Sequence, residues 1–152
     1  MSIPAKIRAA LHERAGSRCE ICSKPANNAH HRRNRSQGGK DVLSNLMLLC
    51  GSGTTGCHGR VTMHPKWAAE NGYAIRGKVD APESVPVWIR GERCRLGDDG
   101  TVTPIPGVEV SCPECPELGV EFYPDADGAA AFVRRHRAIT GHILTITERP
   151  AA

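Results

Sequence analysis

Ala29-His30-His31-Arg32-Arg33 is the stretch around which this sequence is organised, with its continuation through Asn45 to Cys57-His58. Basic, metal-binding and proton-transferring side chains occur together here. Two cysteine pairs enclose the histidine doublet, Cys19-x-x-Cys22 before it and Cys50 with Cys57 after it. The doublet therefore lies in a loop that four potential thiolate ligands can close.

These four cysteines predict a structural zinc site. Four sulfurs complete a tetrahedral site and leave no position open for a substrate. The alternative is that they are scattered buried thiols. No apolar signal segment follows Met1, because charged residues interrupt every hydrophobic run, so we expect a cytoplasmic protein in which paired cysteines favour zinc over disulfides. No stretch approaches the roughly 18 apolar residues of a membrane span.

Length and charge set the wider expectations. The chain has 152 residues but only six aromatic ones, so we expect one ordinary domain or two small ones that need metal staples. Residues 1–60 hold ten Lys and Arg against three acidic residues, a net charge of +7, whereas the rest carries −3. A basic half suits a phosphate backbone, although the charge could also simply solvate a small domain.

Local patterns predict a zinc-stapled α+β fold. The elements expected before residue 77 are a helix from Ile3 to Ala15, a hairpin of Ala29–Arg32 with Leu46–Leu49, a helix from His58 to Met63 and another over 65–71. Beyond it we expect a hairpin of 85–89 with 101–103, a strand over 120–123, a helix over 128–140 capped by Asp127, and a strand over 143–147. Domains are predicted at 1–76 and 85–152, with a linker over 77–84 that is rich in Gly, Pro and charge.

The histidines suggest a particular chemistry. Cleaving a phosphodiester requires an activated water, an electrophile for the developing charge, and groups that position the strand. A histidine doublet with a distant histidine can supply the first two. One imidazole binds a divalent ion while its neighbour stays free as a general base, because its pKa lies near neutrality.

Residues 19–64 resemble the HNH endonucleases, the ββα-metal nuclease family. His30-His31-Arg32, the Ser36–Gly39 loop, Asn45-Leu46, Leu49-Cys50 and Cys57-His58 all occur in the family order. The four cysteines indicate the variant whose motif is pinned by zinc. The glycine-rich approach to Cys57-His58 looks most like phage-borne members.

The resemblance implies a role for each motif residue. His30 would bind the catalytic metal, His31 would be the general base, Asn45 would hold the hairpin by hydrogen bonds, and His58 would be the second metal ligand. Many members place a third ligand one turn later, where this chain has Val61 and Thr62. Either His64 replaces it, or the ion keeps two protein ligands and extra water.

The basic loop and the catalytic ion are also assigned expected roles. The loop cations predicted to clamp DNA phosphates are Arg32, Arg33, Arg35 and Lys40, with a solvated basic loop as the alternative. The catalytic ion could be Mg, Mn, Ni or Zn.

A second metal site is predicted near the end of the chain. Cys112-x-x-Cys115 with His136 and His142 resembles a zinc finger, although twenty residues separate Cys115 from His136 where about twelve are usual. Three arginines lie beside His136: Arg134, Arg135 and Arg137. This zinc-finger-like ββα module could bind DNA or only stabilise the protein. Cys94 is expected to be a small buried side chain.

Together these features predict a metal-dependent DNA endonuclease that nicks or cuts both strands. Phage-like features suggest a role beside genome packaging, with packaging proteins as partners, in the cytoplasm of a bacterial host. Two alternatives use the same residues: a non-catalytic zinc-dependent DNA-binding regulator, and a restriction-type nuclease for modified DNA.

Overall fold

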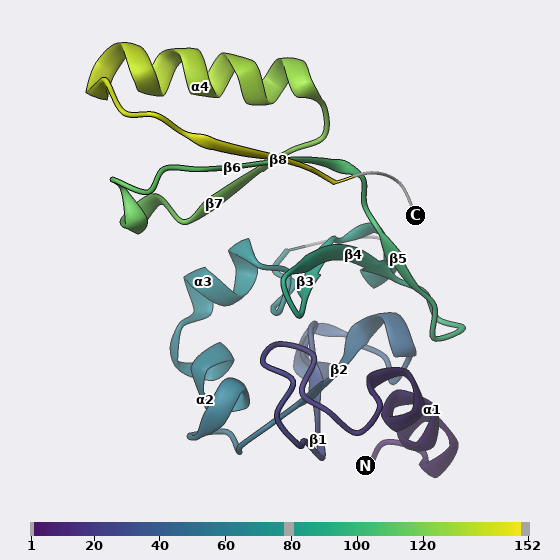
Figure 1. Ribbon diagram of the computed structural model, residues 1–152. Helices are drawn as coiled ribbons and strands as arrows, with labels where there is room; N and C mark the ends of the chain where they lie inside the picture. Colours follow the sequence, from purple (N-terminus) through teal and green to yellow (C-terminus); the bar gives the residue numbers. More distant parts are fainter. Residues whose placement is uncertain (1, 78–80, 150–152) are drawn as a thin grey trace. The chain divides into compact units, whose positions relative to one another are not determined.

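The protein has an α+β fold, as the sequence predicted. The computed structural model describes residues 2–77 and 81–149. The chain forms two compact units, Met1–Thr103 and Pro104–Ala152, which are described separately (Figure 1). No helix among the described residues is long and apolar enough to pass through a bilayer.

The first unit opens with helix α1, Ala5–Ala15, which confirms the predicted N-terminal helix. Pro4 precedes its first turn, and Gly16 ends it in the left-handed conformation. The buried face of α1 packs on Leu46 and Leu48. Arg14 near its end forms a bidentate pair with the buried Glu20, with N–O distances of 2.9 Å. This pair joins α1 to the first cysteine turn.

The centre of the first unit is a β-hairpin followed by a helix, as predicted. Strand β1, Asn28–His31, pairs antiparallel with β2, Leu46–Leu49, so that His30 lies opposite Met47. Helix α2, Gly56–Met63, follows. All four β2 side chains are buried because the strand separates two apolar clusters: Met47 and Leu49 pack on one side, Leu46 and Leu48 on the other.

Helix α3, Pro65–Glu70, agrees with the predicted short helix (Figure 1). The segment after it returns to β1, where the Ile75 N–H donates to the Arg32 carbonyl. Trp67 packs against Tyr73 with ring centroids 5.1 Å apart. The guanidinium of Arg60 lies 4.0 Å above the Trp67 ring. Gly72 turns the chain at φ +74°, and a side chain there would collide with the backbone of Pro86.

The next sheet differs from the predicted hairpin. Its strands are β3, Val87–Ile89, β4, Glu92–Leu96, and β5, Val102–Pro104, in the order β3-β4-β5. The sequence prediction paired the first segment with the last. The structure inserts β4, whose alternate residues Cys94 and Leu96 are buried between outward-facing arginines. That alternation is the signal that the prediction missed.

This sheet belongs to the first unit. Val87, Cys94 and Leu96 pack in the same apolar cluster as Cys19 and Met47. The contact-defined boundary therefore falls after Thr103, whereas the domain division predicted over 77–84 lies within the first unit. Residues 78–80 of that predicted linker lie outside the described residues.

The second unit is a ββα module with one added strand. The elements are β6, Gly107–Ser111, β7, Val120–Tyr123, α4, Ala126–Thr140, and β8, Thr145–Arg149. β6 lies between β7 and β8 and pairs antiparallel with both. Val108 and Val110 of β6, which the sequence prediction missed, pack with Ala129 of α4.

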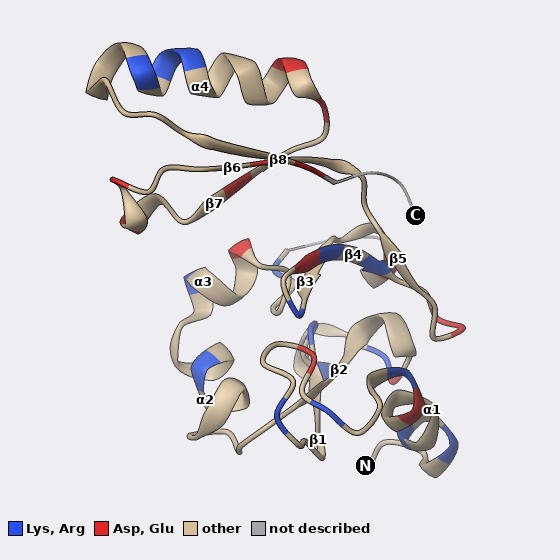
Figure 2. Ribbon diagram, in the orientation of Figure 1, with Lys and Arg blue, Asp and Glu red and all other residues tan. Residues whose placement is uncertain are grey.

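Helix α4 begins two residues before the predicted start. The Asp125 side chain, rather than Asp127, accepts a hydrogen bond of 2.7 Å from the Gly128 N–H. Figure 2 shows acidic residues where α4 begins and basic residues in its second half, which complements the helix dipole. Gly141 ends the helix in the left-handed conformation, as predicted.

Candidate functional site

The four cysteines of the first unit come together in one cluster, which we call the four-cysteine cluster: Cys19, Cys22, Cys50 and Cys57. Their Sγ atoms all lie within 4.8 Å of one another, and those of Cys22 and Cys50 are 3.6 Å apart. Two sulfurs of a tetrahedral zinc site lie about 3.8 Å apart, since each is about 2.3 Å from the ion. The cluster could therefore hold one metal ion, consistent with zinc.

Two turns with special backbone conformations build this cluster. Ser23 adopts φ 64° after the first cysteine pair, and Gly51 adopts φ +83° at the start of the second turn. A side chain at Gly51 would collide with the Thr55 carbonyl. The His58 N–H donates to the Cys50 carbonyl at 3.0 Å. The cluster thus determines where α2 starts and where His58 lies.

The thiols of this cluster do not ionise alike. Burial raises the pKa of Cys19 and of Cys57. Burial also opposes ionisation of Cys22, but the Lys24 N–H and the neighbouring thiols lower the pKa of Cys22 to about 7. A cation would be needed to hold all four sulfurs as thiolates, which agrees with a metal-binding function.

His30 and His58 face each other across the ends of β1 and α2. Their ring centroids lie 5.2 Å apart. His30 Nε2 lies 2.9 Å from the Tyr73 carbonyl oxygen, which accepts its N–H and leaves Nδ1 without that proton. His58 Nδ1 is buried and has no hydrogen-bond partner. Such an orphaned nitrogen beside a second imidazole fits a divalent metal ion.

Burial keeps both of these imidazoles neutral. It lowers the pKa of His30 to about 4, against the opposing hydrogen bond to Tyr73, and it also lowers the pKa of His58. A neutral imidazole is the form that binds a metal ion. The pair is therefore ready to bind a cation at neutral pH.

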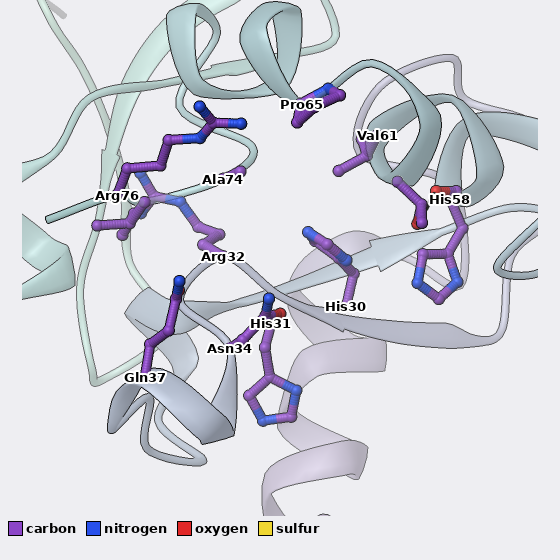
Figure 3. A pocket seen from close by; sticks show the side chains of 12 residues that line it. His30, His31, Arg32, Asn34, Gln37, His58, Val61, Pro65, Ala74 and Arg76 are labelled. Atoms are coloured by element: carbon purple, nitrogen blue, oxygen red, sulfur yellow. Dashed lines mark hydrogen bonds between the residues drawn. The ribbon is translucent and has the colours of Figure 1, made fainter.

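The His31 side chain points away from that of His30 (Figure 3). It interacts with the carboxylate of Asp41. β1 ends at His31, and its Nε2 lies 2.7 Å from Asp41 Oδ1. Arg35 in turn holds Asp41, with Nη2 2.8 Å from each carboxylate oxygen. The hydrogen bond from His31, followed by that from Arg35, lowers the pKa of Asp41. An ionised Asp41 accepts a hydrogen bond from the Nε2–H of His31. This tautomer leaves Nδ1 of His31 as the basic nitrogen.

Asn45 is fully buried and ties the loop after β1 to the hairpin. Its Oδ1 accepts the Arg33 N–H at 2.7 Å. Its Nδ2 donates to the carbonyls of Arg33 and Lys40, each at 3.0 Å. The backbone carbonyl of Asn45 accepts the Arg32 N–H at 2.8 Å. These bonds hold both ends of the loop that carries Asp41.

These side chains surround a cavity of about 320 Å³. His30, His31 and His58 line it together with Val61 and Thr62 of α2 (Figure 3). Arg32 also lines it. Three further polar residues of the lining were not included in the sequence prediction: Asn34, Gln37 and Arg76. That prediction also missed Asp41. Carboxylate and histidine ten positions apart gave no local signal, because only the folded loop brings them together.

The sequence assigned Arg32 to DNA phosphates, but in this structure its guanidinium is engaged by the protein's own backbone. Arg32 is 1 % exposed, and its guanidinium donates to five backbone carbonyls. No N–H of this side chain is left for a phosphate. Burial lowers the pKa of Arg32 to about 10, so it stays charged at neutral pH. It joins β1 to the turns that precede β3.

The other predicted DNA-binding cations lie nearer the surface. Arg33 is partly buried and donates to the Gly77 carbonyl at 3.0 Å. Arg35 and Lys40 are exposed, with Arg35 bound to Asp41.

The structure does not bring His64 to the cavity. His64 is exposed where α2 meets α3, and it is not part of the cavity lining. Val61 and Thr62 occupy the wall that follows His58, and neither offers an imidazole or a carboxylate.

The second unit contains a second metal-binding group, which we call the mixed cluster: Cys112, Cys115, His136 and His142. Its ligand atoms lie within 4.8 Å of one another. Cys115 Sγ lies 3.2 Å from His142 Nδ1 and 3.8 Å from His136 Nε2. The cysteines lie between β6 and β7, and the histidines on and just after α4. This cluster too could hold one ion, consistent with zinc, despite the long spacing.

Comparison with known proteins identifies the centre of the first unit. No curated protein and no solved structure matches the chain. A family model does match, over residues 19–62, which contain β1, β2, most of α2 and the four-cysteine cluster. The family is described as HNH endonuclease, and its members are typically nucleases. The stretch that holds His30, His31, Asn45 and His58 therefore matches the HNH endonuclease family, over less than a third of the chain.

Proposed function

We propose that this protein is a metal-dependent endonuclease that hydrolyses phosphodiester bonds of DNA. The observation that supports it best is one cavity lined by a facing pair of neutral histidines and by a third histidine bound to a carboxylate. None of the three belongs to either metal-binding cluster. They are therefore available for chemistry.

His30 and His58 would hold the catalytic ion, which is Mg, Mn, Ni or Zn. When bound, the ion supplies an electrophile for the phosphoryl oxygens and for the leaving oxygen. The backbone carbonyl of Tyr73 orients His30 by accepting a hydrogen bond from its Nε2–H, as carbonyls behind metal ligands commonly do. With His64 outside the cavity lining, the two imidazoles of His30 and His58 would be the protein ligands.

His31 would act as the general base. Its Nδ1 takes a proton from the water molecule whose oxygen attacks phosphorus. The P–O bond to the 3′ oxygen breaks, and that oxygen takes a proton from solvent as it leaves. Asp41 keeps His31 in the required tautomer and stabilises the imidazolium that forms. Asn45 maintains the loop that carries Asp41. The products are a 3′-hydroxyl and a 5′-phosphate.

The basic loop would hold the DNA backbone. Arg33 and Lys40 lie in the loop between β1 and β2. Their charges suit contacts to DNA phosphates, which carry no sequence information. Arg35 contributes through Asp41 and can reach a phosphate only by sharing its guanidinium.

One experiment separates a nuclease from a binding protein. Supercoiled plasmid is incubated with the wild-type protein and Mg, Mn, Ni or Zn in turn, and in parallel with His31→Ala and His12→Ala. His12 is a partly buried residue of α1 outside the cavity lining and serves as the matched control. We expect the wild type and His12→Ala to cut the plasmid, and His31→Ala to be slower by about 10²- to 10⁴-fold.

The same assay tests the metal ligands. His64→Ala should cut at the wild-type rate, because His64 lies outside the cavity lining. If the wild-type protein binds the plasmid but cuts it with none of the four metals, the protein is a zinc-dependent DNA-binding regulator instead. If it cuts only DNA with modified bases, it is a restriction-type nuclease.

The proposal extends to zinc in both clusters and to a phage origin. Zinc suits four thiolates and equally two thiolates with two imidazoles. Resemblance to phage-borne family members supports a nuclease that works beside DNA packaging in the host cytoplasm. Metal analysis should find two zinc ions per chain, and co-purification from infected cells should recover packaging proteins.

A further inference from the structure

The cavity has a second polar wall for which the proposed chemistry has no use. Asn34 and Gln37 come from the loop after β1, and Arg76 comes from the segment after α3. All three side chains are exposed. Figure 3 shows them on the side of the cavity away from His58. Amide and guanidinium groups donate hydrogen bonds, and phosphodiester oxygens accept them.

Arg76 differs from the other arginines near the cavity. The guanidinium of Arg32 is used by backbone carbonyls, that of Arg33 donates to Gly77, and that of Arg35 holds Asp41. In the described part of the chain, no hydrogen bond or ion pair of the Arg76 side chain is found. Arg76 is therefore a cation at the cavity whose five N–H groups have no partner among the described residues and could bind a ligand.

The backbone around Arg76 is held firmly against β1. The Ile75 N–H donates to the Arg32 carbonyl at 2.7 Å, directly beyond the end of β1, and Ile75 is 4 % exposed. On the other side, Arg33 Nη2 donates to the Gly77 carbonyl. A side chain that begins between two tied neighbours starts from a fixed point beside His31. This lowers the conformational cost of binding a ligand there.

We propose that Arg76 binds a phosphate of the DNA strand in the cavity, with Asn34 and Gln37 donating to the same backbone. The proposal rests on the nuclease function proposed above and extends it. The wall opposite His58 holds the strand through bidentate guanidinium contacts, while the histidine side carries out the hydrolysis. Arg76 thus fills the role that the sequence assigned to Arg32.

The test measures binding separately from cleavage. A fluorescent 20-base-pair duplex is titrated with full-length protein that holds its cluster metals but receives no catalytic metal, at several salt concentrations. The variants are Arg76→Ala, Gln37→Ala and Lys66→Ala. Lys66 is an exposed cation of α3 outside the cavity lining, which makes it the charge-matched control. Unchanged melting temperature and metal content show that each variant is folded.

Arg76→Ala should lose about tenfold in affinity, as expected for a hydrogen bond to a charged group. The slope of log affinity against log salt should become shallower by about one, the value for one phosphate contact. Gln37→Ala should lose about two- to threefold with no change of slope, because an amide carries no charge. Lys66→Ala should bind like the wild type.

The outcomes separate the two proposals. If the wild-type protein neither binds nor cuts DNA under any metal, the nuclease function itself is wrong. If the wild type cuts DNA but Arg76→Ala binds with the wild-type affinity and salt slope, the inference about Arg76 alone is wrong. It is also wrong if Lys66→Ala loses as much affinity as Arg76→Ala, because the effect is then one of total charge.

Discussion

Each unit brings together four side chains that could hold a metal ion, but the two units use their histidines differently. In the second unit, both histidines belong to the mixed cluster, and their ring nitrogens face Cys115. In the first unit, sulfur atoms alone make the cluster. His30, His31 and His58 are left over, and they line one cavity.

The difference teaches how a structural metal group can be told from a reactive one. A closed set of four ligands saturates an ion and stabilises the fold. The first unit has such a set and, beside it, a buried His58 nitrogen with no partner and a His31 nitrogen oriented by Asp41. Imidazoles that no cluster needs are the ones expected to act on a substrate.

The largest expected effect comes from breaking each cluster in turn. Cys57→Ser should lose one zinc ion and all measurable cleavage, because the cluster places His58 and a structural zinc contributes about 10 kcal/mol or more to small domains. Cys115→Ser should also lose one zinc ion yet keep cutting plasmid. Metal analysis and plasmid cleavage measure both. Equal loss of cleavage in the two variants would remove the distinction between the units.

The next effect separates a free histidine from a cluster histidine. His58→Ala should reduce cleavage by more than about 100-fold, since even outer-shell partners of metal ligands are worth about 10- to 100-fold. It should retain both zinc ions. His136→Ala should retain cleavage and lose one zinc ion. A His58→Ala variant that loses zinc but cuts DNA normally would assign His58 to the cluster instead.

A smaller effect concerns acid stability. Burial lowers the pKa of His30 from 6.5 to about 4, so the unfolded chain binds a proton between these values that the folded chain does not. Stability from this group is complete above pH 6.5 and is lost as the pH falls toward 4, by about 2 kcal/mol between pH 7 and pH 5.

Urea unfolding of the wild type and His30→Gln, without added catalytic metal, measures this effect. Release of cluster metal at low pH affects both proteins equally, so the wild type should lose about 2 kcal/mol more than the variant between pH 7 and pH 5. Parallel losses in the two proteins would show that His30 is not buried in its neutral form.

The smallest effect compares two carboxylates that approach histidines. Asp41→Asn should lower kcat by about tenfold with little change in KM, because His31 loses the acceptor that sets its tautomer. The control is Glu114→Gln, where the carboxylate lies 3.8 Å from His142 Nε2 in the mixed cluster. That variant should cut DNA normally. A raised KM in Asp41→Asn would instead indicate a role in DNA binding.

Local rules accounted for much of the fold. Pro4, Gly16, Pro65 and Gly141 mark helix ends by restricting or freeing the backbone, and the helices begin or end beside them. The prediction missed β4 and β6. Each is a five-residue strand whose burial only alternates, so its apolar residues are few, and its pairing partner is needed to identify it.

The cavity wall was harder to predict than the motif. Arg32, Arg33 and Arg76 have the same side chain, so residue type alone cannot tell which of them is free to bind DNA. Arg32 and Arg76 both line the cavity, but the turn at Gly72 and the residues before β3 surround the Arg32 guanidinium with backbone carbonyls. The absence of His64 from the lining has the same kind of cause, because its distance from the cavity depends on how α3 leaves α2.

The sequence by itself determined the ligand sets, the histidine doublet and the order of the HNH motif, because thiol and imidazole chemistry and cysteine spacing are properties of residue type and local separation. Only the tertiary structure decided which charged groups are buried, that Asp41 meets His31, and that Arg76 lines the cavity. Those outcomes depend on contacts between segments far apart in the chain. Burial and hydrogen bonding act on a side chain only after those segments have packed together.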